Sequence, residues 1–156
     1  MTEGRLTCSQ LIDFEVQDAR IIIEDEEGEV RNHFIIHTGD EMIYVAALWR
    51  DGKERHLIIE GVRKLLQIKQ ADYYIHASEA WMGSREDILP SKDPERKEIF
   101  MVIGVERASR KKHHRIYPIL RDEEGKRRLG ETPIMEDESS YGGSSFNLFD
   151  PDPRSD

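Results

Sequence analysis

The sequence predicts an α+β domain in which five antiparallel strands form one sheet packed against two helices. Apolar residues recur at helical spacing in residues 7–27 and 54–70, which indicates two amphipathic helices. Five short stretches outside these helices are rich in β-branched and aromatic residues, as is typical of strands. The strands are joined mainly by short turn-forming groups, which favours antiparallel neighbours.

The composition is that of one domain with a charged surface. The chain has 156 residues, of which 37% are hydrophobic and 35% charged, and its net charge is −9. We expect residues 1–131 to form the domain and residues 132–156, which are rich in Ser, Gly, Pro and acids, to form a tail. Cys8 is the only cysteine, so no intrachain disulfide is expected. With neither a signal peptide nor a long apolar run, the sequence predicts a soluble cytoplasmic protein.

The first half of the chain predicts a helix and a hairpin. The helix spans Thr7–Glu27, is capped by Thr7 or Ser9 and ends at Gly28 in a left-handed turn. The β-branched run Ile21–Ile23 leaves a strand there as an alternative. The hairpin joins Val30–Thr38 to Met42–Trp49. Because both faces of its second strand are apolar, we expect that strand to be covered on both sides.

The second half predicts a helix followed by three strands. The helix spans Glu54–Gln70, and Gly61 within it is interpreted as a close approach to the sheet. Pro118 has no N–H to donate, so its strand is expected at a sheet edge or at a bulge. The strands are Asp72–Met82, Glu98–Arg107 and His113–Asp122.

The order of the elements is helix, two strands, helix, three strands. This order resembles that of profilin-like and roadblock-type domains and, less closely, that of sensory domains of the PAS and GAF kind. The resemblance concerns fold alone, and folds of this size host many functions.

A second resemblance rests on the segment around the loop at residues 83–97. The segment reads Ser78-Glu79-Ala80-Trp81-Met82 and then Pro90-Ser91-x-Asp93-Pro94-x-Arg96-x-Glu98, followed by an apolar strand. It resembles a segment found in uncharacterised bacterial and phage-encoded proteins. The resemblance implies a shared origin and carries over no catalytic residue, but it directs attention to Glu79, Trp81, Asp93, Arg96 and Glu98.

Glu79 is the sharpest single candidate, because it is a carboxylate in a strand that otherwise reads as partly buried. A buried carboxylate needs a partner or a raised pKa, and we predict Arg96 as that partner. The favoured interpretation is a structural ion pair that fixes the loop on the sheet. The alternative is a small hydrolase in which Glu79 acts with Asp93, Glu98 or His76.

The histidines do not predict a metal site. His33 and His37 share one face of a strand but lie roughly 13 Å apart, and the adjacent His113 and His114 point to opposite faces. We therefore expect no bound metal and no cofactor.

Charge is distributed unevenly in the second half. Residues 107–128 hold nine Lys or Arg against three Asp or Glu. Arg110, Lys111 and Lys112 at a hairpin tip are the candidates for a nucleic-acid contact. We favour a solvated turn that protects an edge strand, because the global charge is negative.

The tail carries an apolar group, Phe146-Asn147-Leu148-Phe149, among acids and small residues. This composition is typical of a segment that docks on a partner protein. The alternatives are that it folds back over the basic hairpin, or that it is a disordered solubilising end.

No stretch carries a catalytic signature, so the expected function is non-enzymatic: a binding or regulatory protein that works through protein–protein contacts. A second copy of the chain is one candidate partner. The candidate binding residues are Trp81, Glu79, Asp93, Arg96, Arg110, Lys111, Lys112, Phe146 and Phe149.

Overall fold

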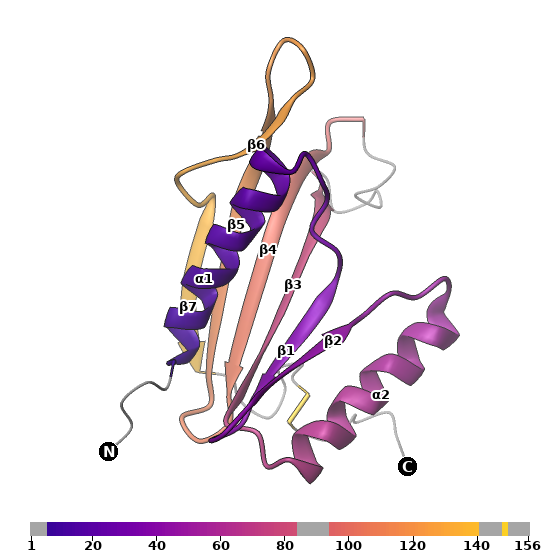
Figure 1. Ribbon diagram of the computed structural model, residues 1–156, viewed down its shortest axis with the longest axis vertical. Coiled ribbons are helices and arrows are strands. Elements are labelled where there is room, and N and C mark those ends of the chain that lie inside the picture. Colours follow the sequence, from indigo (N-terminus) through magenta and orange to yellow (C-terminus); the bar gives the residue numbers. More distant parts are fainter. Residues whose placement is uncertain (1–5, 84–93, 141–147, 150–156) are drawn as a thin grey trace.

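The computed structural model describes residues 6–83, 94–140 and 148–149. It confirms the α+β class: an antiparallel sheet has helix α1 against one face, called the front face, and helix α2 on the other side, against the back face (Figure 1). The strand order is β2-β1-β3-β4-β5-β6, and β7 also pairs with β5. In the part of the chain that the structure describes, no helix has the length and apolar character needed to cross a bilayer.

Helix α1 (Cys8–Arg20) begins where the sequence predicts. The Thr7 side chain accepts a bond from the backbone N–H of Gln10, and the Gln10 side chain accepts one from Thr7 N–H, which together form a capping box. The helix continues as one π-helical turn over Ile21–Asp25, so the alternative of a strand there is wrong. The left-handed residue at its end is Glu27 (φ 53°) and not Gly28.

The hairpin is confirmed with shorter strands, β1 (His33–His37) and β2 (Met42–Ala46). The expectation that its second strand is covered on both sides is wrong, because β2 lies at the sheet edge and leaves Met42 and Tyr44 more than half exposed. Helix α2 (Gly52–Ile68) is capped by Asp51, which accepts from Glu54 N–H. Gly61 is solvent-exposed, and a Cβ there would meet nothing within 4 Å, so it marks no close approach.

Three long strands form the centre of the sheet: β3 (Tyr73–Met82), β4 (Lys97–Glu106) and β5 (Lys111–Arg121). Their side chains alternate between the two faces. The front core collects Tyr73, Ile75 and Ala77, whereas Tyr74 and Val105 belong to the back core.

The predicted number of five strands is wrong, because the sheet contains two more: β6 (Arg127–Leu129) and β7 (Met135–Ser140). Strand β7 lies within the stretch 132–156 that was interpreted as a tail. Its sequence is acidic and has low intrinsic strand propensity, but it pairs with the basic strand β5. There Glu138 lies opposite His113, and Glu136 lies opposite Arg115. Cross-strand opposite charges stabilise such a pair.

Pro118 is not at a sheet edge, because β5 has neighbours on both sides. On the β6/β7 side, the paired residues of β5 are 111–116 and 119–121, so Pro118 falls between the two partner strands. Its carbonyl accepts from Gly130 N–H at 2.8 Å as the chain turns away. The missing N–H of Pro118 therefore interrupts no ladder.

The core is divided by the sheet into two clusters. The front cluster is built around α1 and includes Ile12, Ile75, Phe100, Val102 and Leu129, each at most 1% exposed. The back cluster joins Val62 and Leu66 of α2 to the sheet and also contains Leu148.

Candidate binding site

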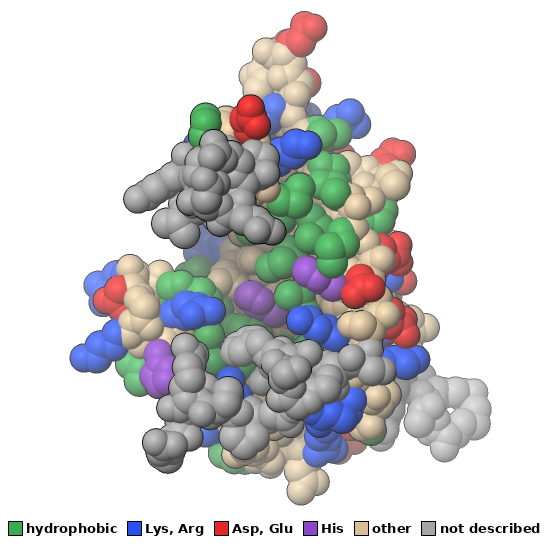
Figure 2. All heavy atoms as spheres, turned by 180° about the vertical axis from the view of Figure 1, so that it is seen from behind, with side chains coloured by type: hydrophobic (Ala, Val, Ile, Leu, Met, Phe, Trp, Pro, Cys, Tyr) green, Lys and Arg blue, Asp and Glu red, His purple; other side chains and the backbone are tan. Residues whose placement is uncertain are grey.

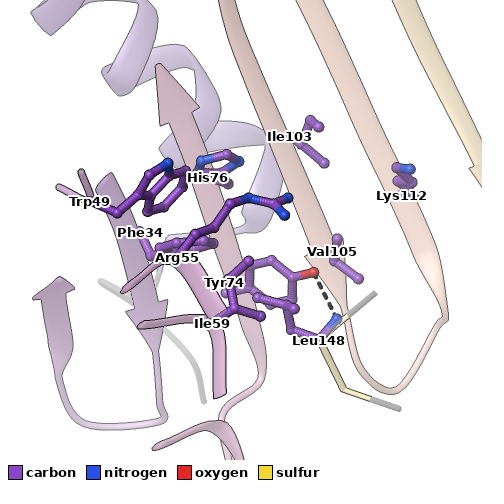
Figure 3. Close-up of a pocket in the computed structure, with 10 residues that line it drawn as sticks. All are labelled: Phe34, Trp49, Arg55, Ile59, Tyr74, His76, Ile103, Val105, Lys112 and Leu148. Carbon is purple, nitrogen blue, oxygen red and sulfur yellow. Dashed lines mark hydrogen bonds between the residues drawn. The ribbon is translucent and has the colours of Figure 1, made fainter. Parts of the chain in front are cut away.

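A pocket of about 140 Å³ lies between α2 and the back face of the sheet (Figure 3). Seen from behind, the molecule shows apolar side chains gathered over this face, with histidine and basic side chains beside them (Figure 2). The pocket is lined by Phe34, Trp49, Arg55, Ile59, Tyr74, His76, Ile103, Val105, Lys112 and Leu148.

Aromatic rings supply much of the pocket wall. Phe34 on β1 stacks on the His76 ring with their centroids 4.5 Å apart, and it meets Tyr74 in a tilted arrangement at 6.3 Å. Trp49 follows β2, and the Arg55 guanidinium lies 5.7 Å from its ring centroid. Flat, rigid rings of this kind present apolar area at little cost in side-chain entropy.

His76 lines the pocket and is the residue there whose side chain could act as an acid or a base near neutral pH. Its Nε2 is hydrogen-bonded to the side-chain oxygen of Asn32. Burial, with smaller contributions from the nearby His33 and Arg55, lowers the pKa of His76 to about 4. The imidazole is therefore neutral at neutral pH, and it offers a dipole and not a charge.

Two cations give the pocket its charge. Arg55 comes from the first turns of α2 and reaches across the pocket toward the sheet, and Lys112 stands on β5 at the opposite side (Figure 3). The described lining residues include no carboxylate, thiol or aliphatic hydroxyl. The pocket thus combines an apolar wall with two positive charges, an arrangement that suits an apolar group attached to an anion.

Part of the pocket is filled by the chain itself. Leu148 is 3% exposed, and its backbone N–H donates to the Tyr74 hydroxyl at 3.0 Å (Figure 3). The ring of Phe149 lies 5.4 Å from that of Tyr74. These two residues lie far along the chain from every other pocket residue, and they pack as a short peptide ligand would.

Glu79 lies on the front face, away from this pocket, and its ion-pair partner is Arg127. The two terminal nitrogens of Arg127, Nη1 and Nη2, donate to the Glu79 carboxylate, which also accepts from Val30 N–H at 2.7 Å. Arg127 donates in addition to the carbonyl of Gly28 at 2.7 Å. The pair therefore joins β3, β6 and the segment before β1. The predicted partner Arg96 is wrong.

Arg96 instead lies over the ring of Trp81, with 4.5 Å between the guanidinium carbon and the ring centroid. Trp81 is 41% exposed. Glu98, opposite Trp81 in the register, accepts from two nitrogens of Arg121 at 2.7 and 2.9 Å. The hydrogen bond and charge of Arg121 lower the pKa of Glu98 despite partial desolvation.

Of the set named for a small hydrolase, Glu79 and Glu98 line one surface pocket together with Trp81, whereas His76 lies apart from them. Glu79 and His76 are three residues apart on β3 and lie on opposite faces of the sheet. Glu98 is engaged by Arg121. Asp93 lies outside the described residues, as does Phe146.

Four of the nine Lys and Arg side chains in the basic segment 107–128 form ion pairs with acids of the same chain that the structure describes. Arg115 contacts Asp13 and Glu136, Lys111 contacts Glu138, and Arg121 contacts Glu98. Arg110 occupies a left-handed turn position (φ 58°). Lys112 is the member of this segment that reaches the pocket. This internal pairing reduces the charge that the segment presents to a nucleic acid.

The sequence indicated Lys112 and Phe149 as binding residues but missed most of the pocket. Trp49 lies in the connection after β2, Arg55 on α2 and Tyr74 on β3, and no local pattern links them. The sequence signal that pointed to Leu148 and Phe149 was a group of apolar residues within an acidic tail.

Comparison of this chain with protein-family models, with curated proteins and with solved structures finds no match. The site has therefore to be interpreted from its own geometry.

Proposed function

We propose that this chain is a non-catalytic binding domain that recognises a short apolar–acidic segment of a partner protein in the pocket between α2 and the sheet. The observation that carries the proposal is the burial of Leu148, a residue from an acidic, Ser- and Gly-rich stretch, in that pocket. An apolar pair placed there by the chain itself supports an apolar peptide segment as the occupant.

The contacts of Leu148 and Phe149 are of the kind that peptide-binding pockets use. One backbone hydrogen bond, from Leu148 N–H to the Tyr74 hydroxyl, sets the position of the peptide. Two apolar side chains then fill the space beside it. Main-chain bonds that position a peptide and pockets that take its side chains are the usual division of labour.

Charge supports the same occupant. In sequence, Leu148 and Phe149 are followed by Asp150 and Asp152, and the pocket carries Arg55 and Lys112. A neutral His76 adds no further cation at neutral pH. An acidic flank on a partner's apolar segment is therefore attracted to the pocket, which raises the association rate as well as the specificity.

The pocket chemistry favours binding over a reaction. The nucleophiles and general acid–base groups that enzymes use are a serine, cysteine or carboxylate, or a histidine with a pKa near neutrality. Among the described lining residues, His76 is the nearest to such a group, and its pKa of about 4 leaves it a weak base held by Asn32.

The test uses the full chain with its own segment displaced. The double substitution Leu148→Ser and Phe149→Ser removes the resident apolar pair without shortening the chain. A fluorescently labelled peptide of sequence 144–153 is then titrated into the variant and into the original chain, and anisotropy is measured. We expect saturable binding to the variant, and at least about tenfold weaker binding to the original chain because its own segment competes.

Two controls make the result specific. Ile134→Ser removes an apolar side chain that is 47% exposed and outside the pocket, and it should leave peptide binding as weak as in the original chain. Arg55→Ala in the opened variant should weaken binding, and more so at low salt. If the opened variant is folded and does not bind the peptide, the proposal is wrong.

A further inference from the structure

A second cluster of functional side chains lies on the front face, at the end of the sheet where α1 begins. Cys8 is the first residue of α1, Glu106 ends β4 and His113 is the third residue of β5. One ligand atom from each residue lies within 4.8 Å of the other two. Cys8, which is distant in sequence, thus meets Glu106 and His113 from the two sides of one hairpin, and a sulfur, an oxygen and a nitrogen come to one place.

The contacts inside the cluster are close and mostly buried. Cys8 is 3% exposed and His113 8%. The Nε2 of His113 lies 2.6 Å from a carboxylate oxygen of Glu106, and its Nδ1 lies 3.4 Å from a carboxylate oxygen of Glu138 on β7. The Glu106 side chain is 31% exposed, so solvent reaches the cluster from that side.

Gly104 leaves the space that the thiol occupies. A Cβ at Gly104 would lie 2.5 Å from the Cys8 sulfur and 2.9 Å from Ile12 Cδ1. Gly104 pairs with His113 across the β4–β5 ladder. The sulfur therefore rests directly against the backbone of β4, beside the strand position that holds the imidazole.

We propose that Cys8, Glu106 and His113 bind one divalent ion of the zinc class. Thiolate sulfur, imidazole nitrogen and carboxylate oxygen are the three ligand types that zinc uses. Three protein ligands leave the fourth tetrahedral position to a water molecule. That water can enter from solvent beside Glu106, whose side chain is partly exposed. The soft thiolate and the imidazole disfavour magnesium and calcium, which prefer oxygen ligands.

The surroundings of His113 fit the same assignment. A metal-bound histidine usually donates its second ring N–H to a carboxylate, which fixes the tautomer and the ring orientation. Glu138 stands at Nδ1 in this position, and its other oxygen lies 3.2 Å from Lys111. Nε2 is then the nitrogen that faces Cys8 and Glu106.

Binding requires only a small rearrangement. Ligand atoms around one tetrahedral zinc ion lie about 3.4 Å apart. His113 Nε2 and the Glu106 oxygen, 2.6 Å apart, would separate by about 0.8 Å, and the widest pair in the cluster, at most 4.8 Å apart, would close by at most about 1.4 Å. The ion replaces the His113–Glu106 hydrogen bond with two metal–ligand bonds. The proton that Nε2 donates to Glu106 moves to Nδ1, which faces Glu138, or to solvent if Nδ1 already carries one, and the thiol proton is released to solvent.

The experiment titrates the full chain, stripped of metal with a chelator, with Co²⁺ as a spectroscopic probe. We expect one equivalent to bind with an intense thiolate-to-cobalt charge-transfer band in the near ultraviolet, and Zn²⁺ to displace it. Cys8→Ser should abolish the band, and His113→Gln should abolish stoichiometric binding. Glu138→Gln should weaken binding by about 10–100-fold.

His33 supplies the matched control. It is also buried and also hydrogen-bonded through Nε2 to a glutamate, Glu15, at 2.9 Å, but among the described residues that pair belongs to no three-ligand group. His33→Gln should keep the cobalt band. Circular dichroism checks that each variant is folded. The proposal is overturned if Co²⁺ does not bind stoichiometrically, or if the band survives in folded Cys8→Ser.

Discussion

The carboxylate of Glu79 on β3 is held by the guanidinium of Arg127 on β6, 48 residues further along the chain. The side chains are only 17% and 14% exposed. The pair therefore works as a clamp at one end of the sheet, where it also holds the backbone of Gly28 and Val30 before β1.

Arg127→Leu should lower the free energy of unfolding by about 2–4 kcal/mol, because it leaves a largely buried carboxylate without its counter-charge. Glu79→Gln should cost less, since an amide oxygen can still accept from Val30 N–H. The measurement is urea denaturation followed by circular dichroism. Arg96→Ala is the matched control: its guanidinium rests on the exposed Trp81 ring, and its loss should cost no more than about 1 kcal/mol. Equal costs for the two arginines would contradict the assignment of the clamp.

Gly104→Ala should destabilise the chain by about 1–3 kcal/mol, because the new methyl group would overlap the Cys8 sulfur and the fully buried Ile12. Gly61→Ala in α2 is the opposite case. A Cβ there meets nothing, so the substitution should stabilise the helix by about 0.5–1 kcal/mol. Thermal unfolding of both variants is the measurement. The melting temperature should fall for Gly104→Ala and rise for Gly61→Ala, and a shift of the same sign in both would contradict the prediction.

The thiol of Cys8 should react very slowly in the folded, metal-free chain. Burial, together with the smaller effects of the negative charges of Glu106 and Glu138, raises its pKa to about 12. At pH 8 the thiolate fraction is then on the order of a thousandfold smaller than that of a free cysteine. Titration with a chromogenic disulfide should show this slow phase, and denaturant should remove it. Rapid labelling of the folded chain would show that the thiol is accessible and ionised.

His76 should make stability fall on mild acidification. Its folded pKa is about 4, whereas an unfolded histidine titrates near 6.5, so the unfolded state binds more protons between these values. Stability at pH 7 is unaffected, and about 3 kcal/mol is lost as the pH falls from about 6.5 to 4. Comparing the pH profiles of the original chain and His76→Gln isolates this contribution. Parallel profiles would be inconsistent with a neutral, buried imidazole.

The pKa of His33 is shifted in the opposite direction to that of His76. Burial alone would lower the pKa of His33, but hydrogen bonds to Glu15 and the Arg31 carbonyl raise it above the ordinary value. Its contribution to stability is therefore fully present below about pH 6.5 and is lost as the pH rises through the folded pKa. Histidine-detected NMR titration should resolve the two rings, with His76 titrating well below His33.

The candidate site was only partly visible in the sequence. An apolar run in an acidic tail drew attention to Phe149, and a cluster of cations to Lys112. The rings of Trp49 and Tyr74 gave no such signal, because an aromatic residue in an apolar stretch is ordinary core. The ligand cluster at Cys8 was hidden for a related reason: its members are on α1, β4 and β5, and Cys8 lies about a hundred residues before Glu106 and His113, which face each other across one hairpin.

Local sequence patterns were enough to predict the two helices, the hairpin, the alternation of the central strands and the antiparallel α+β class. These follow from local periodicity and capping, as with Thr7 and Gln10 at the start of α1. The tertiary structure decided which carboxylate meets which guanidinium, that the acidic β7 becomes a strand beside β5, and that Leu148 is buried beside Tyr74. Such pairings depend on distances between segments far apart along the chain. Several partners of like chemistry compete for each group, and only the folded geometry selects among them.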